Sequence, residues 1–240
     1  MRLFGQVAEY LYERWISVCA IVVFLLAWEI AGHLSPKSVL VRSPIVPPWE
    51  FVFGPSLLGM SDYWTFDFLA PVPTSGGEHT YRGAVLAIVY HSALTLMRLT
   101  LGLLLGTIAG ILLGLAFSWS PFLRRLASTP LHILRMFPLL AMVPLFQFWV
   151  GANTTGAVVF VAYGVGVVYF ATTINAVSNV PNRSFEYAQT LGASRLRIYV
   201  SVVFPAIVPE LCASVMLTLG LAWSAVIGAE YIGLDSGMGR

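Results

Sequence analysis

The sequence has very little charge: only 10% of its 240 residues are Asp, Glu, Lys or Arg, whereas 58% are hydrophobic. Soluble domains carry roughly 25% charged residues, and a chain with so few could not cover a globular surface with water-compatible groups. A lipid bilayer removes that requirement, because lipid solvates apolar faces. The composition therefore predicts an integral membrane protein.

Lysine occurs only once, as Lys37 in a polar stretch, and this excludes an ATP-binding loop of the Gly-x-x-x-x-Gly-Lys-Ser/Thr type. The other basic residues are arginines without a basic run, and the net charge of +2 argues against nucleic-acid binding. Cys19 and Cys212 lie in apolar stretches and supply neither a disulfide framework nor a metal site. We therefore expect no catalytic residue, metal or cofactor on this chain.

Five apolar stretches approach the length of about 20 residues that a membrane span requires. They cover about residues 16–31, 91–117, 131–150, 156–177 and 206–229. The first is short, so its helix should begin near residues 10–12, and its head of mixed charge favours a retained helix over a signal peptide. In the third stretch, Pro138 and Pro144 should kink or break the helix. The predicted fold is an all-α, polytopic helical bundle.

The arginines predict an orientation, because cytoplasmic loops carry an excess of Lys and Arg. One side would hold Arg2, Arg14, Arg124, Arg125, Arg183, Arg195 and Arg197, and the other Lys37, Arg42 and Arg82. The first side should be cytoplasmic. We accordingly expect a cytoplasmic head and first transmembrane helix over residues 1–31, and an external loop segment without periodicity over 32–90. A core transmembrane domain should occupy 91–240, with a cytoplasmic loop at 178–205.

Glycine recurs every four residues in the second stretch, at Gly102, Gly106, Gly110 and Gly114. Small residues at this spacing allow a neighbouring helix to approach closely. The pattern predicts a tightly packed helix pair and carries no information about cargo.

The loop at 178–205 is the most polar interior segment of the chain. A helix start at Pro181 and a stop at Gly192 predict a short helix over 184–191, with Glu186 in its first turn. One face of this helix should carry the apolar side chains of Phe185, Ala188 and Leu191. A second helix with two arginines should then lead into the last apolar stretch. Two short helices that meet at a glycine would form a compact knob for a soluble partner.

The same loop resembles the Glu-Ala-Ala loop of binding-protein-dependent ABC importer permeases. The spacing of Glu186-Tyr187-Ala188, Gly192 and Pro205 agrees with that pattern, although Tyr187 replaces an alanine, and Val202 and Phe204 replace an isoleucine and a leucine. In that family the loop forms coupling helices that dock in a cleft on an ATPase subunit. The resemblance implies that the coupling residues here are Glu186, Tyr187, Ala188, Leu191, Gly192, Ala193 and Pro205.

Further segments resemble the nitrate, sulfonate and taurine branch of this family. They are His91-Ser92, Arg98, residues 133–138, residues 148–151, Gly228-Ala229-Glu230 and Gly237-Met238-Gly239. The resemblance implies a type I importer permease of the bacterial inner membrane that carries a small anion, such as a sulfonate or a nitrate-like solute. Its implied partners are a second permease copy, ATP-binding cassette subunits that hold ATP and Mg²⁺, and an extracytoplasmic solute-binding protein.

Family members continue past the Gly-x-Gly with a last span, whereas this chain stops at Arg240. A sixth span is therefore expected and absent, so either the native protein is longer or another element takes the place of that helix.

Charged residues inside apolar spans are costly and should face the bundle interior, a cavity or one another. Arg98 could hold an anion in bidentate fashion, it could lie near a span end and reach the membrane interface, or it could pair with Glu210 or Glu230 as a structural lock. The candidates for the translocation path or its gate are Arg98, Arg135, Met136, Pro138, Pro144, Glu210 and Glu230.

Two other functions remain open at this point. An ion-coupled secondary transporter or channel would favour paired acids near the midplane and often an inverted repeat. An intramembrane enzyme would need a nucleophile or zinc motif. Neither pattern is evident in the sequence.

Overall fold

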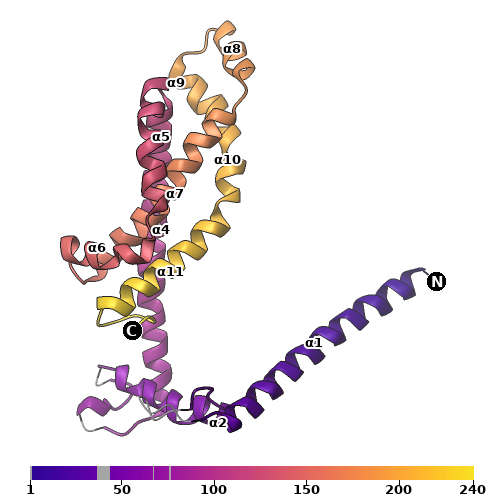
Figure 1. Ribbon diagram of the computed structural model, residues 1–240, viewed down its shortest axis with the longest axis vertical. Helices are drawn as coiled ribbons and strands as arrows, with labels where there is room; N and C mark the ends of the chain where they lie inside the picture. The colour runs from indigo at the N-terminus through magenta and orange to yellow at the C-terminus, as the bar shows by residue number, and fades with distance from the viewer. Residues whose placement is uncertain (1, 37–43, 67, 76) are drawn as a thin grey trace. The chain divides into compact units, whose positions relative to one another are not determined.

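The computed structural model describes residues 2–36, 44–66, 68–75 and 77–240, and all regular elements in these ranges are helices (Figure 1). No β-strand forms in the described ranges, and the all-α fold class is confirmed. Lys37, Arg42 and Asp67 lie outside the described residues. The chain divides into two compact units, Met1–Ile88 and Val89–Arg240.

The first unit begins with α1 (Arg2–Leu34), whose start lies earlier than the predicted residues 10–12. The part Trp15–Leu34 is long and apolar enough to cross a membrane. Its apolar side chains, among them those of Val23 and Phe24, are mostly exposed within the chain. A helix that is apolar on all sides is suited to contact with lipid.

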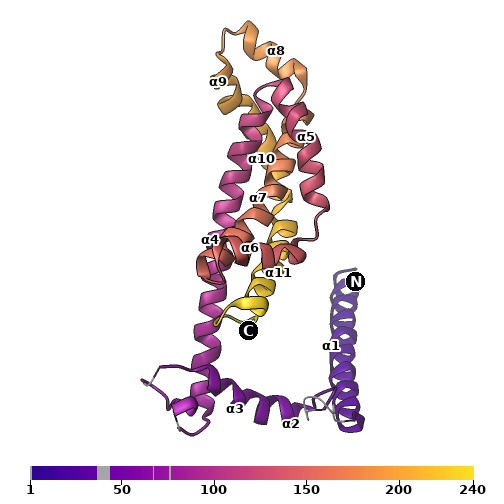
Figure 2. The same cartoon turned by 60° about the vertical axis from the view of Figure 1, so that its left-hand side comes forward.

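The segment expected to be an external loop is helical from residue 49 to residue 63. It comprises α2 (Trp49–Phe51), the π-helix η1 (Val52–Ser56), α3 (Leu57–Gly59) and the 3-10 helix η2 (Met60–Tyr63), and a further 3-10 turn, η3, covers Pro73–Ser75 (Figure 2). A carboxylate oxygen of Glu29 accepts a hydrogen bond of 2.9 Å from the Trp49 backbone N–H at its start. Trp49 stacks on Phe53 with ring centroids 6.0 Å apart. The sequence predicted no helix here, because these short helical pieces depend on local capping and ring stacking and not on a hydrophobic period.

The second unit is built around α7 (Thr154–Asn179). The Asn153 side chain caps its start by accepting a hydrogen bond from the Gly156 N–H, and it ends just before Pro181, which cannot continue a helix. The other elements of this unit are α4 (Tyr81–Ser118), whose first residues belong to the first unit, α5 (Pro121–Met136), the 3-10 helix η4 (Leu139–Met142), α6 (Val143–Val150), α8 (Asn182–Thr190), α9 (Arg195–Ile198), the π-helix η5 (Tyr199–Val203), α10 (Phe204–Ala213) and α11 (Val215–Gly233). Both views place α8 and α9 at one end of this unit and the C-terminus toward the other (Figures 1 and 2).

Five helices in the described ranges are long and apolar enough to cross a membrane: Trp15–Leu34, Tyr81–Ser118, Thr154–Asn179, Arg195–Ala213 and Val215–Gly233. The number equals the predicted one, but the set differs. The predicted third span is bent by 90° between α5 and the η4–α6 segment. Phe137, which precedes Pro138, has the extended conformation that a following proline imposes (ψ 128°).

The break at Pro138 was therefore predicted correctly, whereas Pro144 neither kinks nor breaks a helix. It occupies the first turn of α6, where a proline is tolerated because the N–H it lacks would have no helical partner.

The predicted last span, residues 206–229, is divided at Ser214 into α10 and α11, which follow one another along the bundle (Figures 1 and 2). The Ser214 hydroxyl donates to the Glu210 carbonyl (3.2 Å), and the Thr218 hydroxyl donates to the Ser214 carbonyl (2.9 Å). Such bonds compete with the helical ladder and often bend helices. The pattern missed the division because neither Gly nor Pro marks it.

The glycine ladder of α4 lies directly against α7, as predicted. A Cβ atom built on Gly106 would lie 2.5 Å from the Ala162 carbonyl oxygen, and one on Gly110 would lie 2.6 Å from that of Gly166. Even a methyl group would have to displace the backbone of the neighbouring helix. The two helices therefore meet backbone to backbone.

Candidate functional site

The two short helices of the predicted loop form a knob, defined here as residues 182–198. α8 ends in a Schellman motif: the Ala193 N–H donates to the Ala188 carbonyl (3.0 Å) and the Gly192 N–H to that of Gln189 (2.9 Å). Gly192 has a positive φ of 73°, a conformation that glycine adopts without a Cβ penalty. The Ser194 hydroxyl then caps α9 by accepting a hydrogen bond from the Arg197 N–H. The helix stop at Gly192 is confirmed.

Two local predictions about this knob were wrong. α8 begins at Asn182, two residues earlier than expected, so that Glu186 lies beyond its first turn. Phe185 and Ala188 do pack against the core, but Leu191 is 87% exposed. The chain has already left the helix at Leu191, and the Schellman turn brings Ala193 instead of Leu191 back onto the core.

The outer surface of the knob carries apolar side chains without a partner inside the second unit. Tyr187 is 68% exposed and lies one turn before Leu191. Glu186 and Gly192 are also exposed, and no atom would lie within 4 Å of a Cβ on Gly192. Pro205 is in the first turn of α10 and is exposed as well. The predicted coupling residues thus share one end of the unit, and all except Ala188 and Ala193 are exposed.

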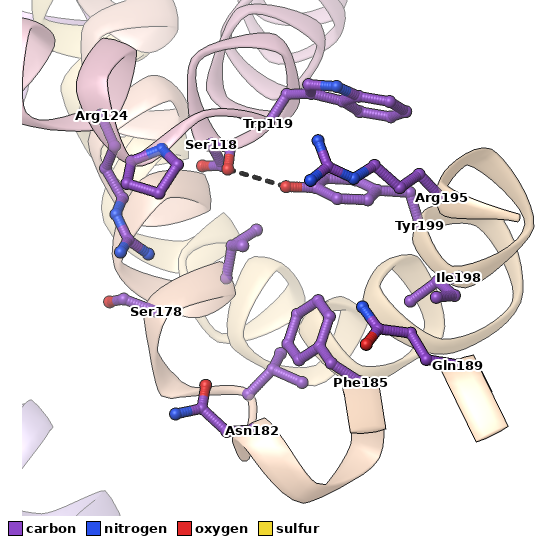
Figure 3. A pocket seen from close by; sticks show the side chains of 13 residues that line it. Ser118, Trp119, Arg124, Ser178, Asn182, Phe185, Gln189, Arg195, Ile198 and Tyr199 are labelled. Atoms are coloured by element: carbon purple, nitrogen blue, oxygen red, sulfur yellow. Dashed lines mark hydrogen bonds between the residues drawn. The ribbon is translucent and has the colours of Figure 1, made fainter. Parts of the chain in front are cut away.

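A cavity of about 450 Å³ lies at the base of the knob, between the α4–α5 connection and α7, α8 and α9 (Figure 3). The Tyr199 hydroxyl donates a hydrogen bond of 2.7 Å to the Ser118 carbonyl, and the ring of Tyr199 lies 4.8 Å from that of Trp119. Arg124 and Arg195 line the cavity from opposite sides (Figure 3). The sequence did not reveal this site, because its residues come from segments that are far apart along the chain.

At the other end of the unit, Arg98 is fully engaged with protein groups. Its Nη1 lies 2.8 Å from a carboxylate oxygen of Glu230, and both side chains are almost completely buried. The guanidinium also donates to the carbonyl and hydroxyl oxygens of Ser236 (2.6 and 2.7 Å) and to the Thr154 hydroxyl. This is the structural pairing with Glu230 that the sequence left open beside an anion-binding role.

Glu230 in turn holds the C-terminal segment against α4. Its carboxylate accepts hydrogen bonds from the Thr95 hydroxyl (2.9 Å) and the Gly239 N–H (3.1 Å). The Gly237 N–H donates to the His91 Nδ1 (2.9 Å), and a Cβ on Gly237 would overlap the Glu230 carboxylate. The Gly-x-Gly is thus required where the backbone folds over a buried charge. We call this group of residues the C-terminal lock; it consists of Arg98, Glu230, His91, Thr95, Thr154, Ser236, Gly237 and Gly239.

The remaining path candidates lie apart from this lock. Arg135 and Met136 are exposed at the end of α5. Pro138 lines an apolar groove of about 570 Å³ together with Leu139, Leu140, Met216, Leu217, Gly220, Leu221, Ser224 and Ala225. Glu210 accepts a hydrogen bond of 3.3 Å from Asn179. The structure therefore brings Arg98 and Glu230 together, but it does not join them to Glu210, Arg135 or Pro144.

Comparisons with known proteins identify relatives of this chain. The family model of the binding-protein-dependent transport system inner membrane component matches residues 102–240. The putative aliphatic sulfonates transport permease protein SsuC of Bacillus subtilis is 26% identical over 205 residues, which are 85% of this chain and 71% of that protein. The taurine transport system permease protein TauC of Escherichia coli is 30% identical over 149 residues, 62% of this chain and 54% of that protein.

Two further proteins are similar over much of their length. The nitrate import permease protein NrtB of Synechococcus elongatus is 25% identical over 223 residues, 92% of this chain and 73% of that protein. A solved structure of the MetNI methionine ABC transporter, in inward-facing conformations, gives a TM-score of 0.48 at 23% identity and covers 61% of this chain and 72% of that chain.

The named sequence relatives are permease proteins, which favours the importer permease over the ion-coupled transporter or channel. The family model covers more than half of the 240 residues. The chain therefore belongs to the binding-protein-dependent transport system inner membrane components, as a multi-pass permease of an ABC importer.

Proposed function

We propose that this permease carries a small anion and is driven by separate cytoplasmic ATPase subunits that grip the knob. The observation that carries this proposal is the exposed tip of the knob, where Tyr187 and Leu191 flank the open surface of Gly192. Exposed apolar side chains next to an accessible backbone are typical of a surface that binds another protein. The arginines at this end of the unit support a cytoplasmic location.

The construction of the knob suits it to transmit a force. Phe185 and Ala188 fix α8 to the core, and the Schellman motif joins α8 to α9 without a flexible loop. α9 continues through η5 into α10, while α8 follows α7 after two residues. A displacement of the knob by closing ATPases would therefore reach α7 and α10 directly. Glu186, Ala193 and Pro205 belong to this coupling segment.

Shortening the Leu191 side chain should weaken the hold of the ATPase. If Leu191 is an anchor, Leu191→Ala should cost more than about 1 kcal/mol of association free energy, or about fivefold in affinity. The measurement is the amount of ATPase subunit that co-purifies with the permease as salt and dilution increase. Leu112→Ala is the matched control, since Leu112 is an exposed leucine (61%) on α4 outside the knob. If both variants retain the same amount of ATPase subunit, the proposal is contradicted.

We place the translocation path along α11 and the bend at Pro138, between two copies of the permease. The exposed side of α11 includes Met216 (83%) and Leu217 (66%) and borders the apolar groove beside Pro138. Met136 (82%) lies at the end of α5 nearby in sequence. A second permease copy would cover this face. An external solute-binding protein would deliver cargo near the C-terminal lock, which would form a rigid part of the path beside its external opening.

The cargo we propose is a small oxyanion of the sulfonate type. Its support is the relatives named above, a sulfonates transport permease, a taurine transport permease and a nitrate import permease. Arg135 offers an exposed guanidinium beside Met136, and this group matches planar oxyanions in bidentate fashion.

The cargo proposal predicts that reconstituted transporter, with its binding protein and ATPases, takes up labelled taurine and that other alkanesulfonates compete. Arg135→Gln should slow uptake about tenfold, because a bond to a charged group contributes roughly 1.5–3 kcal/mol, whereas Arg135→Lys should keep much of it. Uptake that sulfonates and nitrate leave unaffected, while neutral solutes compete, would exclude this cargo class.

A further inference from the structure

We propose that the cavity at the base of the knob is an oxyanion site, distinct from the transport path, that binds a phosphate-type group. We call it the oxyanion pocket and define it by Ser118, Arg124, Asn182, Gln189, Arg195 and Tyr199. Free phosphate, sulfate, a phosphate ester and a phospholipid headgroup share the chemistry that these residues recognise.

The electrostatics of the pocket are wholly positive. Arg124 and Arg195 both line it, no acidic residue does, and neither arginine has an ion-pair partner among the residues that the structure describes. The first residues of α5 (Pro121) and α8 (Asn182) also line it. The N-terminal ends of helices carry partial positive charge and free N–H groups, so they attract anions. Two guanidinium groups without a counter-charge in the chain therefore make this pocket suited to an anion from outside it.

A buried hydroxyl provides independent support. Ser118 is only 7% exposed and lines the pocket, yet within the described ranges its Oγ has no hydrogen-bond partner. Its carbonyl is already occupied by the Tyr199 hydroxyl. Buried polar side chains are nearly always satisfied by protein, water or ligand. A hydroxyl that lacks a partner in a pocket with two free guanidinium groups is a donor suited to an oxyanion.

The remaining lining defines the ligand class. The side-chain amides of Asn182 and Gln189 add N–H donors, and the rings of Trp119 and Phe185 add flat apolar walls (Figure 3). The volume of about 450 Å³ lies in the range of small-molecule sites, roughly 300–1,000 Å³. It accommodates an oxyanion together with part of an organic group.

An oxyanion bound here would connect elements that the proposed transport cycle has to move. Arg124 belongs to α5, whereas Asn182 belongs to α8 and Arg195 to α9. A ligand that bridges them favours the conformation in which the knob is held against the α4–α5 connection. The oxyanion thereby becomes a regulator of coupling, and this consequence alone rests on the proposed function.

The binding test uses the chain in phosphatidylcholine nanodiscs, with the subunits that co-purify with it. Phosphate and sulfate, but not chloride at equal ionic strength, should raise the thermal unfolding midpoint and show saturable binding by calorimetry. Arg124→Gln and Arg195→Gln should each weaken binding about tenfold or more, since each removes a charge-assisted hydrogen bond, and Ser118→Ala should weaken it less. Arg197→Gln is the matched control, because this exposed arginine of α9 does not line the pocket.

A second arm identifies the source of the anion. If phosphatidylglycerol in the nanodisc stabilises the protein and free phosphate does not, the ligand is a lipid headgroup; the reverse identifies a soluble oxyanion.

The proposal is overturned if neither stabilises beyond chloride, if Arg197→Gln loses as much binding as Arg124→Gln, or if binding occurs only without ATPase subunits, since a partner carboxylate then fills the pocket. Leu191→Ala should leave oxyanion binding unchanged, which separates this result from a failure of the coupling proposal.

Discussion

Replacing Glu230 with glutamine is expected to destabilise the folded chain by about 3–5 kcal/mol, because it removes the counter-charge of a buried arginine. The Arg98 side chain is 2% exposed and its guanidinium lies 2.8 Å from the Glu230 carboxylate. The glutamine oxygen can still accept from Thr95 and Gly239, so the loss reports chiefly the unpaired charge. The measurement is equilibrium unfolding in mixed detergent micelles, supported by the thermal midpoint.

The double variant Arg98→Met/Glu230→Gln should recover part of this loss, since it removes the unpaired buried charge; the recovery is incomplete because Ser236 and Thr154 lose the donor that Arg98 supplies. Glu210→Gln is the matched control: Glu210 is half-buried, accepts a single bond of 3.3 Å from Asn179, and should change stability by less than about 1 kcal/mol. A Glu230→Gln protein as stable as the Glu210→Gln protein would show that the lock is dispensable.

Substitutions at Gly192 are expected to weaken ATPase binding in the order Ala, Asn, Arg, with a loss of about 2–4 kcal/mol for Arg, or thirtyfold to nearly a thousandfold. The reason is bulk: the chain leaves open space around this glycine, so a larger side chain meets only the partner. Retention of the ATPase subunit and ATP-driven uptake are the two measurements.

Backbone strain predicts a different order for the same series. The φ of 73° is less unfavourable for Asn than for Ala, so strain alone would make Gly192→Ala the more damaging of the two small changes. The thermal midpoint of each variant serves as the control for folding. If Gly192→Ala weakens ATPase binding more than Gly192→Asn does, Gly192 shapes the turn and does not contact the ATPase.

Much of the fold followed from local pattern. Gly106 and its neighbours on the ladder predicted the close approach of a helix to α4, without showing that this helix is α7; Pro138 predicted the broken span, and Gly192 predicted the end of α8. Each of these residues acts through its own backbone or on the adjacent turn. Their spacing therefore carries the structural information.

What could not be predicted depends on contacts between distant segments or on single-residue offsets. Arg98 and Glu230 are 132 residues apart, and nothing in their spacing distinguishes Glu230 from Glu210 as the partner. Leu191 fits the helical period, but α8 ends one residue before it, so the side chain points outward. The last span is divided at Ser214, where the hydroxyls of Ser214 and Thr218 bond to carbonyls one turn earlier. Side chains in many unbroken helices form the same bonds, so the sequence does not mark the division.

The glycine contact between α4 and α7 restricts how the permease can change shape. Shear between packed helices normally proceeds by small rotamer changes in the layer of side chains between them. Gly106 and Gly110 leave no such layer, because the carbonyls of Ala162 and Gly166 occupy the positions where side chains would be. We therefore expect sliding along this seam to be hindered, so that α4 and α7 change position together as one body.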